Sequence, residues 1–344
     1  MNLETKEKVD GVIAIDTTFL KKILEALGPI TVNDYNETVT PDNFYLVTQT
    51  HAEKDFFPGS QQKKNFLQAL LNTMLAKLSD GKHVPYEALV QKVGEALNEK
   101  HVLFAFPDDA TQNVFTVNGY SSALWDGRKG QENTFLDFLG VNEANLGANK
   151  SNYYLTRSIK QDAVINEAGE VNTTVTVNYK NSSKQDSPFG GEYKNYVRFI
   201  LPQRASVQDI IIDGQAMQTV PAITDPAVFT KKGFIPPSGL EVEKTQVADK
   251  QVVGFLLLVP AGESKTVVVT YTIPSIVNTD SAFSYNLRLF KQPGTIDDSY
   301  SASITYPQSF KVVKAGTGVD LGGKVVFEGK LLTDTDLTAN FSKK

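Results

Sequence analysis

The sequence predicts an α/β domain followed by an all-β sandwich, because the spacing of its apolar residues changes midway. Before residue 138, apolar residues mostly recur at helical intervals of three and four, with a few short apolar runs between them. After residue 159, apolar and polar residues alternate almost to the end, as in strands buried on one face. The stretch between them is rich in Asn and Gly. We therefore predict domains at 1–150 and 151–340.

Length and composition bound the classes of protein that remain. A chain of 344 residues, 41% hydrophobic and 21% charged, has the composition of globular domains and the length of two. A net charge of -5 argues against a nucleic-acid partner, which would require a basic surface. The absence of Cys excludes disulfides and thiolate metal sites. No apolar run approaches the roughly 20 residues that a membrane helix needs.

In the first half, the order of strand and helix patterns predicts a sheet covered by helices. Gly28 and Pro29 end the first helix, and Gly119 ends the last one. Two firm strands and a third short one are few for such a domain, so we expect either a further strand at 135–146 or more of the domain upstream of Met1. The apolar runs predict strands at 11–15, 30–32 and 101–106, and the helical patterns lie at 17–27, 41–54, 60–78, 84–97 and 109–117.

In the second half, residues 171–179 alternate strictly, and the turn at 166–169 predicts a hairpin with residues 153–165. Many short strands with Gly, Pro and Asp turns are typical of an antiparallel sandwich of immunoglobulin-like type. Residues 218–250, with four prolines and mixed charge, indicate a long loop. Further strands are expected at 197–201, 210–212, 252–259, 267–273, 283–289, 300–306 and 325–332.

Four separated segments resemble the bacterial family of unknown function DUF4012, in the family's order. The resemblance covers about Val9 to Pro307. It implies a membrane-anchored protein on the extracytoplasmic face, with its anchor upstream of this sequence. The segments are VDGVIAIDTTFLKKILEALGPITV, DFFPGSQQKKNFLQALLNTMLAKL, NEANLGANKSNYYLTRSIKQDAVINEAGEVNTTVTVNYKN and YVRFILPQ.

The first segment also resembles, more distantly, the central part of a LytR-CpsA-Psr domain. That family transfers glycopolymers from a polyprenyl-pyrophosphate lipid to peptidoglycan, and its arginines and acidic residues bind the pyrophosphate and its metal. One hallmark is an Asp followed by an Arg-rich segment that ends in Arg-Gln-Gln. Here Asp55 precedes Gln61 and Gln62, Ser60 stands in the place of the arginine, and no Arg lies between Asp55 and Gln62. The resemblance thus implies the fold without this part of the chemistry.

Gln61, Gln62, Lys63 and Lys64 form a polar group at the start of a predicted helix. Backbone N–H groups and the helix dipole favour anions at such a position, so the functional interpretation is a phosphate site. The alternative, which we favour, is a solvated polar face beside the apolar stripe.

Asp16 follows a predicted buried strand, at the sheet edge where ligands of α/β proteins commonly lie. Its functional interpretation is a metal ligand, and the favoured alternative is a cap for the following helix. His51, His83 and His101 are the only histidines, and none has a partner at metal-ligand spacing, so we expect structural roles for them.

Asn149 and Lys150 lie in the stretch that joins the predicted domains, and they are either a binding loop or turn residues. We favour the second interpretation. Asp334 and Asp336 are either calcium ligands or an exposed turn, and the turn is preferred because a fuller ligand loop is missing. The single Trp125 is either a sugar-stacking residue or, as we prefer, a packing residue.

Together these observations favour a non-catalytic, extracytoplasmic cell-envelope protein that binds a glycan, a lipid carrier or a protein partner. One alternative is a divergent glycopolymer transferase acting on a polyprenyl-pyrophosphate-linked substrate, with ligands at Lys63 or Lys64. Mg²⁺ is expected only for that alternative, and no other cofactor is expected. A third hypothesis is a structural stalk or surface protein.

Overall fold

The computed structural model describes residues 9–53, 62–81, 84–124, 132–184, 187, 189–230 and 232–344. Two compact units make up the chain, Met1–Trp125 and Asp126–Lys344. We expected the boundary at residue 150, but it falls earlier in the chain. The reason is that strand β5 (Thr134–Asn145) is hydrogen-bonded between strands of the second unit.

The first unit contains the predicted helices, but its described strands form two small sheets rather than one helix-covered sheet. In one, β1 (Val12–Ile15) pairs antiparallel with β4 (Val102–Ala105); in the other, β2 (Ile30–Val32) pairs with β3 (Glu37–Val39). All four residues of β1 are exposed, so its predicted burial is wrong, because β4 is its sole strand partner among the described residues. The other elements are α2 (Thr17–Leu27), η1 (Asn33–Tyr35), α3 (Phe44–Glu53), α4 (Gln62–Ser79), α5 (Tyr86–Asn98) and α6 (Asp109–Val117).

Helix α2 begins and ends where its sequence signals predict. The Asp16 side chain accepts a hydrogen bond from the backbone N–H of Phe19 at 2.9 Å, which satisfies one of the unpaired donors of the first turn. Gly28 ends the helix at a φ of 76°, a value that glycine adopts without steric cost. The apolar face of α2 packs with α3 and α4 in one buried cluster, formed by Ile23, Leu24, Leu27, Ile30, Val32, Val39, Phe44, Phe66, Leu70 and Met74.

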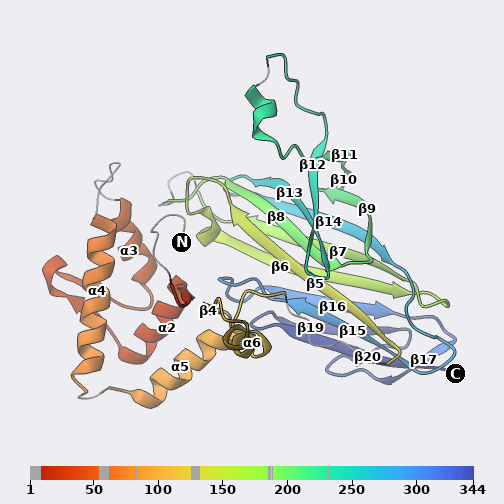
Figure 1. The fold of residues 1–344 in the computed structure, drawn as a ribbon, viewed down its shortest axis with the longest axis horizontal. Helices are drawn as coiled ribbons and strands as arrows, with labels where there is room; N and C mark the ends of the chain where they lie inside the picture. The colour runs from red at the N-terminus through yellow and green to blue at the C-terminus, as the bar shows by residue number, and fades with distance from the viewer. Residues whose placement is uncertain are drawn as a thin grey trace. The chain divides into compact units, whose positions relative to one another are not determined.

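The second unit consists of two eight-stranded sheets that share one hydrophobic core (Figure 1). We call them the β5 sheet, in the order β11-β12-β13-β8-β5-β15-β20-β17, and the β6 sheet, in the order β10-β9-β14-β7-β6-β16-β19-β18. The remaining elements are η2 (Ser151–Tyr154), β6 (Leu155–Ile165), β7 (Val171–Asn181), β8 (Tyr193–Pro202), β9 (Ser206–Ile212), β10 (Gln215–Ala216), β11 (Thr219–Pro221), η3 (Pro226–Thr230), β12 (Leu240–Val247), β13 (Lys250–Val259), β14 (Ser264–Ile273), β15 (Phe283–Phe290), β16 (Ser299–Thr305), β17 (Phe310–Lys314), β18 (Val319–Asp320), β19 (Lys324–Lys330) and β20 (Thr335–Lys343).

The β-rich second unit confirms that part of the prediction, but its sheets are mixed rather than antiparallel. Strands β5 and β15 run parallel, as do β6 and β16. Two connections cross from the β5 sheet to the β6 sheet: β5 leads to β6, and later β15 leads to β16. Because β15 lies beside β5 and β16 lies beside β6, and both connections cross in the same direction, the neighbouring strands are parallel. The immunoglobulin-like connectivity that we expected is not confirmed.

Residues 218–250 form a projecting arm rather than a long loop without regular structure. They include β11, η3 and β12, and Figure 1 shows the arm extending away from the sheets at the top of the view. Strand β12 pairs antiparallel with β13 and thereby extends the β5 sheet into the arm. Among the described residues, no helix combines the length and hydrophobicity needed to cross a membrane.

Candidate functional site

A cavity lies at the base of the arm, and we call it the arm-base cavity. Its volume is about 660 Å³, within the range of ligand-binding pockets. The lining combines an aromatic ring, aliphatic side chains and two carboxylates. It consists of Tyr196, Ala222, Ile223, Thr224, Gly239, Leu240, Glu241, Glu243 and Leu256.

Strand alternation places Tyr196, Leu256, Glu241 and Glu243 on the outer face of the β5 sheet, whereas Leu240 packs against the core. On β8, Asn195 and Val197 are fully buried toward the other sheet, so Tyr196 between them points outward. On β13, Phe255 and Leu257 are buried in the same way, and Leu256 is 39% exposed. The floor of the cavity is therefore a sheet face.

Gly254 leaves space for the Tyr196 ring because it has no side chain. It faces Arg198 across the β13–β8 pair. A Cβ atom added to Gly254 would lie 2.8 Å from the Tyr196 hydroxyl oxygen and 3.1 Å from the ring carbon that carries it. Since real Cβ atoms do not approach other atoms this closely, Tyr196 can lie over the sheet here because this position has no side chain.

The two carboxylates of the cavity each use one oxygen to hold a neighbouring group. The Tyr196 hydroxyl donates a hydrogen bond to Oε2 of Glu243. Oε2 of Glu241 accepts from the backbone N–H of Ile223 at 3.1 Å. Burial, together with the hydrogen bond to Glu243, raises the pKa of Tyr196 to about 12, so the phenol is protonated near neutral pH.

This lining suits a ligand that has both an apolar face and hydrogen-bond donors. A carboxylate has two oxygens, so Glu241 and Glu243 each have a second oxygen that can accept a hydrogen bond from a ligand. Leu256 and the Tyr196 ring supply apolar contact area. A second cavity, of about 180 Å³ beside Phe138 and Lys250, is smaller than the usual range.

Asp16 has the structural role that we favoured from the sequence. Besides capping α2, its Oδ2 lies 2.7 Å from Nδ1 of His101, whose side chain is completely buried. No group of three or more potential metal ligands occurs in the part of the chain that the structure describes. The described contacts of Asp16 thus link the start of α2 to the residue that precedes β4.

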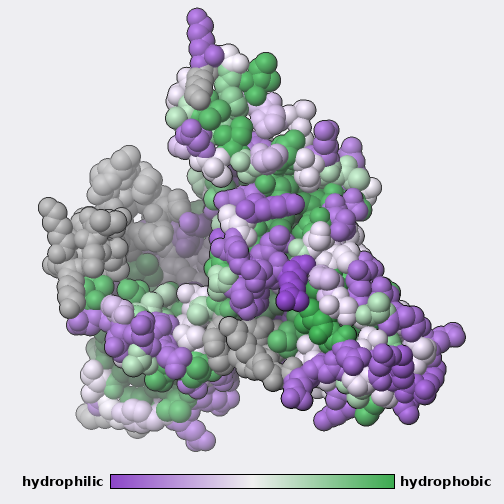
Figure 2. Space-filling view, turned by 45° about the vertical axis from the view of Figure 1, so that its right-hand side comes forward, coloured by the Kyte–Doolittle hydropathy of each residue, from purple (hydrophilic) through white to green (hydrophobic). Residues whose placement is uncertain are grey.

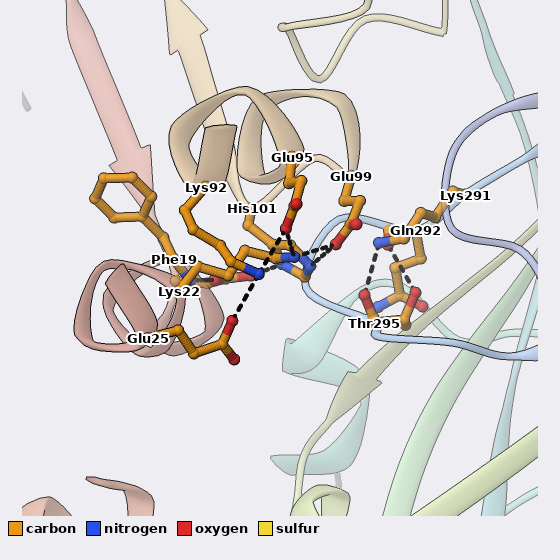
Figure 3. Close-up of polar contacts among 11 residues, drawn as sticks. Phe19, Lys22, Glu25, Lys92, Glu95, Glu99, His101, Lys291, Gln292 and Thr295 are labelled. Carbon is orange, nitrogen blue, oxygen red and sulfur yellow. Dashed lines mark hydrogen bonds and ion pairs between the residues drawn. The ribbon is translucent and has the colours of Figure 1, made fainter. Parts of the chain in front are cut away.

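A cluster of paired charges joins α2 to α5 next to this contact (Figure 3). Lys22 lies 3.2 Å from Glu95 and 3.1 Å from Glu99, while Lys92 lies 3.0 Å from Glu25 and 3.1 Å from Glu95. Its hydrogen bonds to Glu25 and Glu95 raise the pKa of Lys92, and the hydrogen bond from Lys92 lowers the pKa of Glu95. Each lysine bridges two carboxylates, which is the arrangement of a helix–helix joint.

The side chains of the predicted phosphate site lie outside the described part of the structure. Gln61 lies outside the described residues. Gln62, Lys63 and Lys64 begin α4, but their side chains lie outside the described structure. A pyrophosphate site at this helix start therefore remains a prediction.

Asn149 and Lys150 lie in the turn that precedes β6, where the described contacts are those of a loop. Oδ1 of Asn149 accepts from the hydroxyl of Ser151 at 2.8 Å, and its Nδ2 donates to the carbonyl of Glu192 at 2.9 Å. The backbone N–H of Lys150 donates to the carbonyl of Phe189 at 2.8 Å. These contacts support the structural interpretation.

The TDTD motif leads into strand β20: Thr333 and Asp334 precede the strand, and Thr335 and Asp336 begin it. Oδ1 of Asp334 accepts from the backbone N–H of Lys291 at 2.8 Å. Asp336 makes a two-point ion pair with Arg288, at 2.9 and 2.6 Å. Both acids therefore fix β20 beside β15 and its following loop.

Of the other singled-out side chains, the ring of His51 stacks on Phe66, with centroids 4.1 Å apart. His83 and Trp125 lie outside the described residues. Sequence reasoning missed Glu243 because it interpreted 218–250 as a loop, and it missed Tyr196 because that residue lies just before the strand predicted at 197–201. The usable signal for β12 was the short alternation of apolar and acidic residues in LEVE at 240–243.

Comparisons with known proteins support the DUF4012 prediction. The family described as "Protein of unknown function (DUF4012)" matches residues 1–52. The LytR-CpsA-Psr resemblance is not shown and remains a prediction. A search of curated proteins found no match.

Three solved structures illustrate the structural matches. Native yeast LTA4 hydrolase is 9% identical with a TM-score of 0.31, and the match covers 55% of this chain and 29% of that one. An M1 zinc metallopeptidase from Deinococcus radiodurans is 10% identical with a TM-score of 0.27, covering 55% and 42%. A putative nutrient binding protein from Legionella pneumophila is 7% identical with a TM-score of 0.34, covering 60% and 72%. This chain spans 29% of the hydrolase's length, and these scores do not establish a common fold.

Proposed function

We propose that this chain, whose residues 1–52 match the DUF4012 family, is a non-catalytic binding protein of the bacterial cell envelope. Its proposed ligand is a glycan on the extracytoplasmic side of the membrane, held in the arm-base cavity. The observation that carries the proposal is the lining of that cavity, where the Tyr196 hydroxyl donates a hydrogen bond to Glu243 and Leu256 lies opposite Tyr196 on the neighbouring strand.

The chemistry of a sugar ring matches this lining. A pyranose has an apolar face of C–H groups, which packs on an aromatic ring or on leucine side chains. Its hydroxyls donate hydrogen bonds, and bonds to an ionised carboxylate are about twice as strong as bonds between neutral groups. Tyr196 and Leu256 provide the first kind of contact, and Glu241 and Glu243 provide the second.

The two carboxylates also predict which glycans are excluded. A phosphate or sulfate group in the cavity would face two negative charges of the same sign. We therefore expect neutral glycans and glycans with free amines to bind, and polyanionic ones to be rejected. This selectivity favours the glycan over the pyrophosphate of a lipid carrier as the occupant of this cavity.

The experiment is a thermal-shift titration of the full chain with chitotetraose, with its de-N-acetylated form and with dextran sulfate. A ligand that binds the folded state raises the melting temperature by mass action. We expect saturable shifts with the first two, the larger one with the amine form, and none with dextran sulfate. A shift with dextran sulfate alone, or equal shifts in Glu243→Gln and the parent, would contradict the proposal.

Glu328→Gln provides the matched control. Glu328 is an exposed glutamate of β19 on the β6 sheet, so this change removes the same charge on the other sheet. The shift with the amine form should be unchanged in Glu328→Gln and reduced in Glu243→Gln. Equal reductions in both variants would indicate a general charge effect and overturn the assignment to the cavity.

A further inference from the structure

We propose that the tip of the arm inserts into the interface of a lipid bilayer. The tip comprises η3 and residues 232–237. This proposal goes beyond glycan binding, because it concerns different residues of the arm. Figure 2 shows hydrophobic side chains gathered on the arm at the top of the view.

Two large apolar side chains at the tip are mostly exposed to solvent. Ile235 is 85% exposed and Phe229 is 57% exposed. Phe229 and Phe234 form an edge-to-face pair with centroids 5.2 Å apart. This pair orders the tip, while Ile235 and much of Phe229 remain in water, where an apolar surface is unfavourable.

The shape of the tip favours a bilayer over a protein surface. A specific protein interface buries about 800 Å² on each partner, formed by roughly 20–30 residues. The tip is a short segment at the end of a narrow projection, which is a small area for such an interface. Shallow insertion into the boundary between headgroups and acyl chains needs a few apolar side chains to penetrate about 5–10 Å.

The polar groups at the tip suit the headgroup region. Lys232 is exposed beside these apolar residues, and a lysine can keep its ammonium among phosphate headgroups while its stem lies along apolar atoms. Asp225, the acidic group closest in sequence, accepts a hydrogen bond from the N–H of Ala227 at the start of η3. Pro226, Pro236 and Pro237 restrict the backbone and so lower the entropy that insertion must overcome.

Cosedimentation of the full chain with vesicles tests the proposal, using vesicles of phosphatidylcholine alone and of phosphatidylcholine with 30% phosphatidylglycerol. We expect binding to both, and stronger binding to the anionic vesicles. Phe229→Ser combined with Ile235→Ser should weaken binding to both by about tenfold or more, because burial of each apolar side chain is lost. Lys232→Glu should weaken binding to the anionic vesicles selectively, by about fivefold or more.

Leu321→Ser is the matched control, since Leu321 is 66% exposed on the same unit but outside the arm. It should bind vesicles like the parent. Absence of parent binding to either vesicle, or equal binding by the double variant, would overturn the proposal. A third outcome would also overturn it: the parent binds no vesicles but self-associates, and the double variant does not self-associate. That result would indicate a protein partner at the tip. Glu243→Gln should bind vesicles normally, which separates this result from the test of glycan binding.

Discussion

Nη1 of Arg157 and Oε1 of Glu143 lie 2.6 Å apart inside the sandwich, joining β6 of one sheet to β5 of the other. Arg157 also pairs with Asp298, and the Tyr193 hydroxyl donates to the second oxygen of Glu143 at 2.9 Å. Burial alone lowers the pKa of Arg157, but the two carboxylates raise it above its ordinary value. The guanidinium therefore stays charged, and it neutralises two acids that are themselves nearly buried.

Arg157→Met should destabilise the sandwich strongly, because it leaves two buried carboxylates without their cation. Breaking a buried ion pair from one side costs about 3–5 kcal/mol. The measurement is denaturant unfolding followed by the far-ultraviolet signal of the sheets. The control is Arg288→Met, which removes the more exposed pair with Asp336 and should cost about 1 kcal/mol or less. Equal costs for both variants would contradict the role assigned to Arg157.

Asp16 should reveal two separable contributions to the stability of the first unit. Asp16→Asn keeps a good cap and loses the charge beside His101, whereas Asp16→Ala loses both. We expect Asp16→Ala to cost about 1–2 kcal/mol for the cap and a further ~1–3 kcal/mol because the buried Nδ1 of His101 loses its partner. Asp16→Asn should cost less than Asp16→Ala in thermal unfolding. Asp108→Ala removes only the cap of α6, so it should also reduce stability by less than Asp16→Ala does.

The charge cluster between α2 and α5 should stabilise the first unit in a pH-dependent way. The hydrogen bond from Lys92 lowers the pKa of Glu95, so its contribution is present above the unfolded value of about 4.3 and is lost as the pH falls through the folded value. Glu95→Gln should therefore lower the melting temperature most near pH 7, and the difference should shrink as the pH falls toward 3. In a Lys92→Met background this pH dependence should shrink. A constant difference from pH 7 to pH 3 would exclude the linkage.

Gly254→Ala should weaken glycan binding through Tyr196. The new Cβ would displace the Tyr196 hydroxyl, so the hydrogen bond to Glu243 and the position of the ring both change. We expect a loss of at least about tenfold in affinity for de-N-acetylated chitotetraose by calorimetry. The effect should be much smaller in a Tyr196→Ala background. Gly94→Ala, in helix α5 where a Cβ meets nothing, should leave binding unchanged and stabilise the first unit by about 0.5–1 kcal/mol.

The sequence predicted local structure well, because local signals determine it. Asp16 and Gly28 fixed the two ends of α2, and the alternation at 171–179 fixed β7 and its hairpin with β6. Long-range pairing was not predictable in the same way. The apolar residues at 134–145 predict a strand but do not indicate which unit it joins. In the structure this strand pairs with β8 and β15.

The candidate site was harder to predict, because it depends on that pairing. Tyr196 and Glu243 are 47 residues apart and meet through β13, which pairs with both β8 and β12. Nothing local to either residue indicates this contact. In contrast, the capping role of Asp16 follows from its immediate neighbours in the chain, and that interpretation agrees with the structure.

Calorimetric titration of the parent and of Glu243→Gln with de-N-acetylated chitotetraose tests the central claim most directly. We expect the parent to bind, Glu243→Gln to lose about tenfold or more in affinity, and Glu328→Gln to match the parent. Tyr196→Ala should lose at least as much as Glu243→Gln, because it removes both the ring and the donor to Glu243. Parent binding that neither Tyr196→Ala nor Glu243→Gln changes would place any glycan site outside the arm-base cavity and contradict the account.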